Sequence, residues 1–160
     1  MNPQEYLEKI LITGGNITST DYLQLGIIEE SGEIAGKLKK YRRGDFSFEQ
    51  LRESIKKEIG DLSWYLVLYA HINGYPIEKF REPHEKDIMK NINNMEIMKG
   101  RLAKAEHPRH RAKIIESLVG CSVDLASSFG YTMDEITNAN IEKTMSRLAR
   151  NKIRGSGDER

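Results

Sequence analysis

The chain has 160 residues, the size of one ordinary domain and enough to bury a core. Apolar residues make up 38% and charged residues 31%, and 25 lysines and arginines against 24 acids leave a net charge of +1, which excludes a strongly basic or acidic protein. The one cysteine, Cys121, has no internal disulfide partner and no segment reads as a leader or a membrane span, so we expect a cytoplasmic protein.

The pattern of breaks predicts an all-α fold. Proline is rare, glycines separate the periodic segments, and no segment alternates like a strand. Asn2 caps the first helix, with Pro3 at its first position, and the Ser47–Gln50 and Thr132–Glu135 pairs read as capping boxes. The predicted helices are about 3–12, 18–41, 47–73, 76–81, 84–105, 109–129 and 132–150. We expect a single domain over 1–154 and a flexible glycine-rich tail at 155–160.

Two predicted core stripes are each interrupted by an acid. The second helix has apolar residues on one face at Leu23, Ile27, Ile34, Leu38 and Tyr41. The third helix has them at Leu51, Ile55, Leu62, Leu66 and Tyr69. Glu30 falls within the first stripe and Glu58 within the second. A carboxylate in a core stripe is costly unless it is paired or binds a metal ion.

Each of these acids has a second acid three residues later, on the same helix face. Glu33 follows Glu30, and Asp61 follows Glu58. The two helices are joined by a short turn, so they are expected to be antiparallel neighbours that bring the four carboxylates to one level. Glu29 lies one turn before Glu33 and reaches the same neighbourhood.

Four carboxylates so placed must bind protons or a cation, because each pair about 4 Å apart repels by roughly 4 kcal/mol at a dielectric of 20. Oxygen ligands without histidine or cysteine favour a hard ion, Mg²⁺ first and Mn²⁺ as a substitute. The alternative is that the acids lie on solvated faces or pair with Lys37, Arg52 or Lys57. Two acid pairs level across one hairpin favour the metal site. A ferritin-like di-iron site is not expected, because it requires Glu-x-x-His.

The acids also carry a resemblance to a known family. Residues 29–33, EESGE, followed by residues 58–61, EIGD, resemble the EExxE…ExxD signature of the MazG-like all-α nucleotide pyrophosphohydrolases, which include dimeric dUTPases, dCTP pyrophosphatases and phosphoribosyl-ATP pyrophosphohydrolases. The resemblance implies a four-helix-bundle core, a homodimer or homotetramer, and Mg²⁺-dependent hydrolysis of a nucleoside triphosphate between its α and β phosphates. It makes the metal ligands and catalytic acids Glu30, Glu33, Glu58 and Asp61, with Glu29 in support or positioning water.

The C-terminal segment resembles the same family. Residues 130–143, GYTMDEITNANIEK, are similar to the close of many phage and bacterial members. The resemblance implies that Asn140 and Lys143 bind phosphates, with Arg147 one turn later on the same face, although a solvated helix face has the same appearance. Trp64 is a candidate to stack on a base, although a tryptophan in an apolar helix more often belongs to the core.

Residues 75–129 depart from the compact family pattern, in which the Trp-Tyr helix leads almost directly into the helix that follows Gly-Tyr. Residues 74–78 and 130–134 look like two versions of one helix junction, which predicts an inserted or duplicated helical hairpin between them. Ile114 and Ser117 occupy the places of the second acid pair, so we expect one metal site per chain.

An alternative function rests on residues 101–113. This segment has a concentration of basic side chains, namely Arg101, Lys104, Arg109, Arg111 and Lys113, with His107 and His110. A non-catalytic nucleotide- or nucleic-acid-binding protein would use it, but it lacks interleaved aromatic residues. The two histidines are a weak indication of a zinc site. No residue fixes the base or sugar of a substrate, so standard dNTPs, dUTP, dCTP, oxidised nucleotides and alarmones all stay open.

Overall fold

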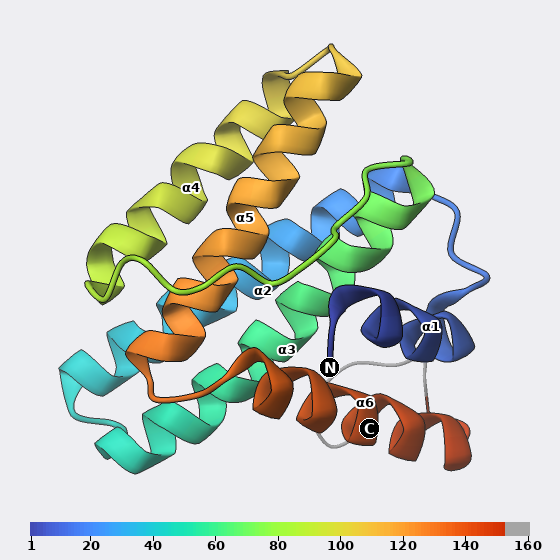
Figure 1. Cartoon of the computed structure of the whole chain (residues 1–160). Coiled ribbons are helices and arrows are strands. Elements are labelled where there is room, and N and C mark those ends of the chain that lie inside the picture. Colours follow the sequence, from blue (N-terminus) through green and yellow to red (C-terminus); the bar gives the residue numbers. More distant parts are fainter. Residues whose placement is uncertain (153–160) are drawn as a thin grey trace.

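The computed structural model describes residues 1–152 and contains six α-helices and no β-strand in that range (Figure 1). The helices are α1 (Pro3–Gly14), α2 (Thr20–Arg43), α3 (Phe48–Ile72), α4 (Ile88–Lys104), α5 (Pro108–Ser128) and α6 (Met133–Ala149). The predicted all-α fold is therefore confirmed. The predicted tail at 155–160 lies outside the described residues. Within residues 1–152, no helix is both long enough and apolar enough to cross a membrane.

Side-chain caps set the starts of three helices where the sequence predicts them. Asn2, Ser47 and Thr132 each accept a hydrogen bond from the backbone N–H three residues later, and the side chain of that later residue accepts one from the backbone of the cap. These reciprocal bonds satisfy donors that the first turn of a helix leaves without a partner. Gly44 directly follows the last residue of α2, and its φ of 90° is a left-handed conformation that favours glycine.

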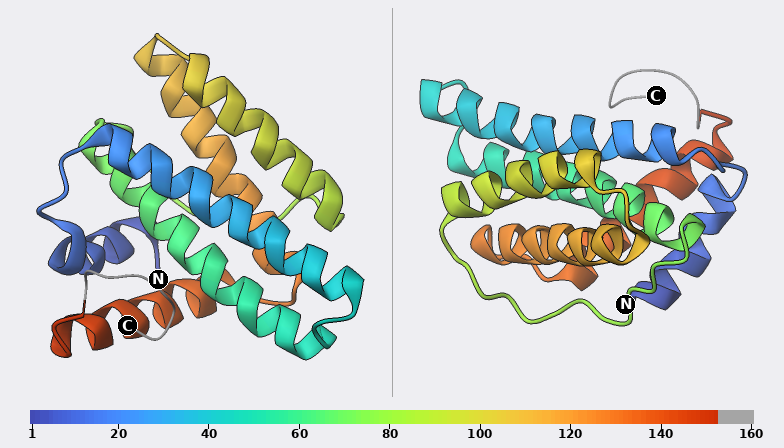
Figure 2. Two further views of the ribbon diagram at one scale, coloured as in Figure 1. Left: turned by 180° about the vertical axis from the view of Figure 1, so that it is seen from behind. Right: turned by 90° about the horizontal axis from the view of Figure 1, so that it is seen from above.

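The antiparallel α2–α3 hairpin is the centre of the fold, and α3 also contacts α1, α5 and α6 (Figure 2). Both predicted core stripes are buried, apart from one position. Tyr41 is 37% exposed, so its predicted place in the core is wrong. It lies near the turn that joins the two helices, where its ring contacts that of Phe48 with centroids 6.1 Å apart.

Residues 75–87 form no helix, which corrects two predictions. A helix over 76–81 is absent, and α4 begins at Ile88 rather than near His84. Asp87 is the residue that starts α4, because its side chain accepts a hydrogen bond from the backbone N–H three residues later. The segment instead forms a strap that crosses the outer side of α5 (Figure 1).

The strap is held to α5 by side-chain contacts. The guanidinium of Arg81 donates to both carboxylate oxygens of the buried Asp124, at 2.9 and 2.5 Å. One of these oxygens also accepts from the backbone N–H of His84 at 2.7 Å. Pro76 and Pro83 have no backbone N–H, so a helix here would lose hydrogen bonds that the strap does not need. The contacts of Arg81 and His84 with Asp124 therefore outweigh the local tendency of this segment to form a helix.

α3 and α5 end in the same way. Gly74 and Gly130 have φ of 69° and 78°, and the tyrosine after each, Tyr75 or Tyr131, donates its backbone N–H to the carbonyl oxygen five residues earlier, at 2.8 and 2.9 Å. The first junction continues into the strap and the second into α6. These matched ends support the prediction of an inserted or duplicated hairpin over 75–129, which stays a prediction.

Candidate functional site

Three carboxylates from two helices converge on one point of the α2–α3 hairpin. One oxygen atom from each of Glu30, Glu33 and Glu58 lies within 4.8 Å of the other two. Glu58 is buried, Glu30 is half-buried and Glu33 is exposed, so the group extends from the core of the hairpin to its surface. The spacing of the first two along α2 is the reason that they share a face. The predicted convergence of these three acids is found in the structure.

A lysine partly neutralises the most buried of these acids. Nζ of Lys37 lies 3.0 Å from Oε1 of Glu58, and the two side chains are 18% and 3% exposed. Lys37 lies one turn beyond Glu33 on α2, and it is one of the partners that the alternative reading of the acids proposed. The structure therefore contains a cationic contact within the acid group itself.

Asp61, the fourth predicted ligand, is held by the last helix rather than grouped with the other three. Its Oδ1 accepts a hydrogen bond from Nδ2 of Asn140 at 2.8 Å, and its Oδ2 forms an ion pair with Lys143. The two partners lie three residues apart on α6, which places both on one face. The structure thus brings Asn140 and Lys143 to Asp61, and their expected binding of phosphates stays a prediction.

A tyrosine from the first helix orients this contact. The buried hydroxyl of Tyr6 donates to Oδ1 of Asn140 at 2.8 Å and lies 3.4 Å from the carbonyl oxygen of Gly60. With its oxygen so occupied, the amide of Asn140 directs its nitrogen to Asp61. Burial, with a smaller effect of Asp61, raises the pKa of Tyr6 well above its ordinary value, so the hydroxyl keeps its proton.

Gly60 allows the approach of α6 to α3. A Cβ atom at this position would lie 3.1 Å from Cβ of Asn140, which is closer than most side chains pack. Glycine within a helix costs roughly 1 kcal/mol relative to alanine. The close contact gives Gly60 a reason to be there. At Gly32 and Gly36, in contrast, a Cβ atom would meet nothing within 4 Å.

Glu30 has a shifted pKa within this group. Burial, together with the charges of Asp61, Glu58 and Glu33, raises the pKa of Glu30 to about 8, while Lys143 opposes the shift. Burial is the main cause, and the excess of negative charge from the other three acids contributes to the raised pKa. A divalent cation would relieve that excess.

Three aromatic side chains contact one another, and one of them lies near the acids. The rings of Trp64 and Tyr65 meet edge to face with centroids 5.0 Å apart, and Tyr65 lies 6.2 Å from Tyr22. Burial raises the pKa of Tyr65, the hydrogen bond with Tyr22 adds to this, and the charges of Glu30 and Glu29 contribute, which places the phenol near the acids. Tyr65 also packs on Gly26, where an added Cβ atom would collide with its ring.

The remaining predicted residues lie around this site. Glu29 is exposed on α2 and is not one of the three grouped acids, although its charge reaches Tyr65. Arg147 is buried, 8% exposed, one turn beyond Lys143 on α6. Trp64 is half-buried and packs against Gly14 of α1, so it belongs in part to the core.

Two contacts were not predicted from the sequence. Tyr6 has the spacing of a core residue on α1, with Pro3 and Ile10 on the same buried face, and nothing in that pattern identifies its hydroxyl as a site group. The second contact joins α4 to the acid motif, where Nζ of Lys99 donates to the buried Oγ of Ser31 at 2.6 Å. Only the fold shows these residues to be neighbours, because they are distant in sequence.

The donor set fits a hard divalent cation. The three grouped acids offer only carboxylate oxygens, and no histidine or cysteine belongs to the group. Mg²⁺ and Mn²⁺ prefer oxygen ligands of this kind. Lys37 and Lys143 each pair with one acid of this region, and the charges of neighbouring acids still contribute to the raised pKa of Glu30.

Part of the site lies in a segment that matches a known protein family. Residues 18–83 match the model of the MazG nucleotide pyrophosphohydrolase domain. This range contains α2, α3 and all the predicted metal ligands, but it does not contain α6. The Gene 37 protein of Mycobacterium phage L5 is 33% identical over 58 residues, which cover 35% of this chain and 51% of that protein. The chain thus spans about half the length of this curated relative. No solved structure gave a significant match. Segment 18–83 of this chain is therefore similar to the MazG nucleotide pyrophosphohydrolase domain.

Proposed function

We propose that this protein hydrolyses a nucleoside triphosphate or deoxynucleoside triphosphate between the α and β phosphates and requires Mg²⁺, for which Mn²⁺ can substitute. The observation that carries the proposal is the group of three carboxylate oxygens within 4.8 Å of one another. The MazG family is typically dependent on a divalent metal, which agrees with this donor set. Hydrolysis adds water across the phosphoanhydride bond and releases a nucleoside monophosphate and pyrophosphate.

In this proposal Glu30, Glu33, Glu58 and Asp61 hold the cation. When bound, the ion stabilises negative charge on the phosphate oxygens in the transition state. Glu33 is exposed and offers its carboxylate toward the side from which substrate arrives. Glu29 is exposed on the same helix, and we assign it to positioning water at the edge of the site.

The last helix provides the groups that bind phosphate. Lys143 forms an ion pair with Asp61 and remains 21% exposed, so its ammonium group can also donate a hydrogen bond to a phosphate oxygen. Asn140 donates to the same carboxylate and fixes its direction. Arg147 follows one turn later and extends the positive face of α6. Charge-assisted hydrogen bonds of this kind are among the stronger polar contacts in proteins.

The aromatic residues beside the acids are the proposed contact for the base. The ring of Tyr65 contacts those of Trp64 and Tyr22, and the charges of Glu29 and Glu30 contribute to its raised pKa. A base stacked on Tyr65 would therefore place its phosphates toward the acids. Stacking on an aromatic ring tolerates any base. The proposal therefore leaves the base and sugar open.

The test is pyrophosphate release from a panel of nucleotides with Mg²⁺. The panel contains standard nucleotides, dUTP, dCTP, oxidised nucleotides and alarmones. Glu58→Gln and Asp61→Asn should abolish turnover and keep the helical circular dichroism of the wild type. Glu49→Gln is the matched control, because this acid lies on α3 with its side chain 75% exposed. Loss of helical signal together with activity would instead indicate a structural role for the acids.

The expected homodimer or homotetramer is part of the proposal. Leu25 and Ile28 on α2 are 65% and 46% exposed, and they are the apolar residues that contact with a second copy would cover. Sedimentation of the wild type and of Leu25→Glu tests this, because the charge should dissociate an oligomer formed through α2. A cytoplasmic location also remains a proposal.

A further inference from the structure

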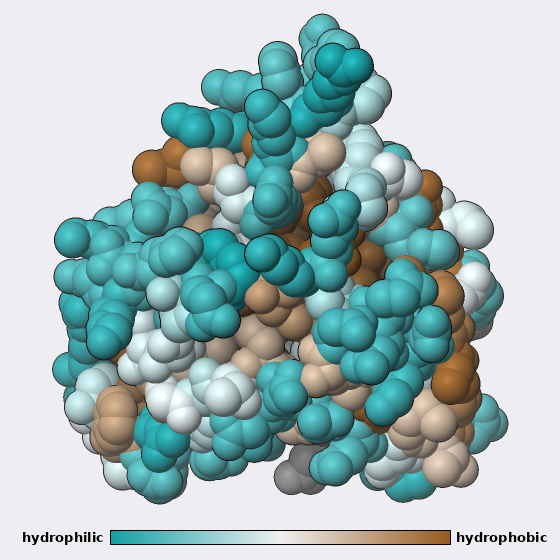
Figure 3. All heavy atoms as spheres, in the orientation of Figure 1, coloured by the Kyte–Doolittle hydropathy of each residue, from teal (hydrophilic) through white to brown (hydrophobic). Residues whose placement is uncertain are grey.

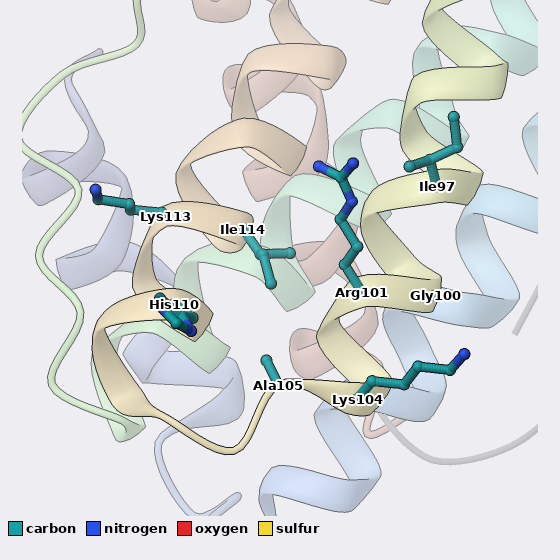
Figure 4. A pocket seen from close by; sticks show the side chains of 8 residues that line it. All are labelled: Ile97, Gly100, Arg101, Lys104, Ala105, His110, Lys113 and Ile114. Carbon is teal, nitrogen blue, oxygen red and sulfur yellow. The ribbon is translucent and has the colours of Figure 1, made fainter.

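A groove lies at the outer end of the α4–α5 hairpin, separate from the acids (Figure 4). Its volume is about 560 Å³. Its apolar lining residues are Ile97 of α4, Ile114 of α5 and Ala105, which follows the end of α4. Three cations also line it, namely Arg101, Lys104 and Lys113. We call this the hairpin groove. It lies in the part of the hairpin that projects from the remainder of the fold (Figure 1).

The surroundings of the hairpin groove are strongly positive. Residues 97–114 contain six lysines and arginines against one acid, Glu106, a formal charge of +5. Because the whole chain carries +1, the remaining residues together carry −4. The space-filling view shows hydrophilic residues covering the projecting end of the hairpin (Figure 3). A concave surface of one sign concentrates ions of the opposite sign.

The cations of the groove are not neutralised by the protein. Within residues 1–152, Arg101, Lys104 and Lys113 form no ion pair and no side-chain hydrogen bond. Arg111, a neighbour in sequence, is different, since it donates to the carbonyl oxygen of Ala105 at 2.7 Å and so supports the hairpin turn. The groove cations are therefore available to an anionic ligand.

The shape of the groove suits a molecule with an apolar part and an anionic part. Figure 4 shows Arg101 and Ile114 between the two helices, with Lys104 and Lys113 extending to either side. The α4 wall is open at Gly100, where a Cβ atom would meet nothing within 4 Å. The volume lies within the range of small-molecule sites. We expect a planar base to lie against the apolar side chains and its phosphates to contact the cations.

We propose that the hairpin groove binds a free nucleoside polyphosphate at a second site, distinct from the acids of α2 and α3. A single-stranded nucleic acid is the less suitable ligand, because such sites interleave basic residues with stacking aromatics and residues 97–114 contain no phenylalanine, tyrosine or tryptophan. The inference does not depend on the proposed hydrolysis, since it concerns binding without turnover.

The experiment measures ATP binding to the full chain by calorimetry in EDTA, which suppresses metal-dependent binding at the acids. Gly100→Phe fills the groove, and Gly100→Ala is its matched control, since both remove the glycine but only phenylalanine occupies the space. The double charge reversal Arg101→Glu with Lys113→Glu is compared with Lys9→Glu with Lys79→Glu, which makes the same change in net charge at exposed positions elsewhere.

The proposal expects Gly100→Phe and the groove charge reversal to weaken ATP binding by about tenfold or more, the equivalent of roughly 1.4 kcal/mol. Both controls should stay within about twofold of the wild type, and melting curves should show that every variant is folded. Failure of the wild type to bind ATP in EDTA would overturn the proposal. Equal ATP affinities of Gly100→Phe and Gly100→Ala would also overturn it, as would equal losses of affinity in the groove charge reversal and in its control. A loss of ATP binding in Lys143→Met but in none of the groove variants would overturn it too.

A competition experiment separates the two sources of phosphate. A single-stranded DNA oligonucleotide is added to the wild type with ATP bound. Weak displacement by the oligonucleotide at matched phosphate concentration supports a nucleotide site. Displacement that is stronger than that by free ATP would overturn the proposal in favour of a nucleic-acid surface.

Discussion

Lys37 of α2 forms an ion pair with Glu58 of α3, with Nζ 3.0 Å from Oε1, so a lysine occupies the inner side of the acid group. The carboxylate is nearly inaccessible to solvent and would otherwise depend on a metal ion for compensation. Glu58 thus pairs with a lysine, as the alternative interpretation of the sequence predicted. It also belongs to the group of acids that we predicted to bind a metal ion. The pair compensates part of the Glu58 charge without a metal ion.

Replacing Lys37 with methionine should destabilise the metal-free protein. Because Glu58 stays buried and loses its counter-charge, the free energy of unfolding in EDTA should fall by about 2 kcal/mol, less than for a fully buried pair. Urea unfolding measures this. Lys39→Met, at an exposed position on the same helix, should have little effect. Added Mg²⁺ should reduce the difference in free energy of unfolding between the wild type and Lys37→Met. Equal free energies of unfolding in EDTA would show that the ion pair does not stabilise the metal-free protein.

Tyr6→Phe should lower kcat while leaving the fold intact. Without the hydroxyl, the amide of Asn140 loses the bond that fixes its orientation toward Asp61, at a cost of about 1 kcal/mol in stability. We expect kcat to fall several-fold with KM little changed. Tyr75→Phe is the control, since its hydroxyl makes no hydrogen bond to a described residue. A fall in stability without a fall in kcat would mean that Tyr6 is only structural.

Gly60→Ala should displace α6 from the acids. The added methyl group would lie 3.1 Å from Cβ of Asn140, so the helix must move by a few tenths of an ångström. We expect a larger loss of turnover than of thermal stability. Gly36→Ala is the matched change, because its methyl group meets nothing within 4 Å, and it should stabilise the protein by about 1 kcal/mol. Equal effects of the two changes would show that the contact with α6 is not limiting.

The contact between the strap and Asp124 should contribute to the free energy of unfolding, and this contribution should depend on pH. Burial alone would raise the pKa of this carboxyl, but hydrogen bonds from Arg81 and from the backbone of the strap outweigh burial and lower it. A lowered folded pKa gives stability that is present above the ordinary value near 4 and is lost as pH falls through the folded value. Arg81→Met should therefore reduce the free energy of unfolding at pH 7, and this deficit should shrink toward pH 3.

The control for the strap is Lys79→Met, an exposed change in the same segment. Chemical denaturation of both variants and the wild type across pH 3 to 7 measures the difference. A deficit for Arg81→Met that is constant with pH would mean that Asp124 does not gain from the contact. A deficit as large for Lys79→Met would assign the effect to the strap as a whole.

The elements governed by local chemistry were predictable from the sequence. The starts of α1, α3 and α6 follow from side-chain caps, and the α2–α3 hairpin follows from its buried stripes and short turn. The convergence of Glu30, Glu33 and Glu58 also follows, because helical spacing and an antiparallel turn fix their relative positions.

The features that depend on distant contacts were not predictable in this way. The strap over 75–87 exists because Arg81 reaches Asp124 of α5, a partner 43 residues later. Tyr6 joins the site from 134 residues before Asn140. Periodicity identifies a buried face, but it does not show which element covers that face or what its polar atoms meet there.

The acids on α2 and α3 and the groups on α6 that we propose to bind phosphate belong to one polypeptide, and in the described residues Asp61 joins the two sets directly. A chain that lacks Glu58 and a chain that lacks Lys143 would each retain one of the two sets. Because the contact through Asp61 lies within a single chain, we expect that mixing these two inactive proteins restores no activity. Each copy of the chain should then be active or inactive independently of the copies beside it.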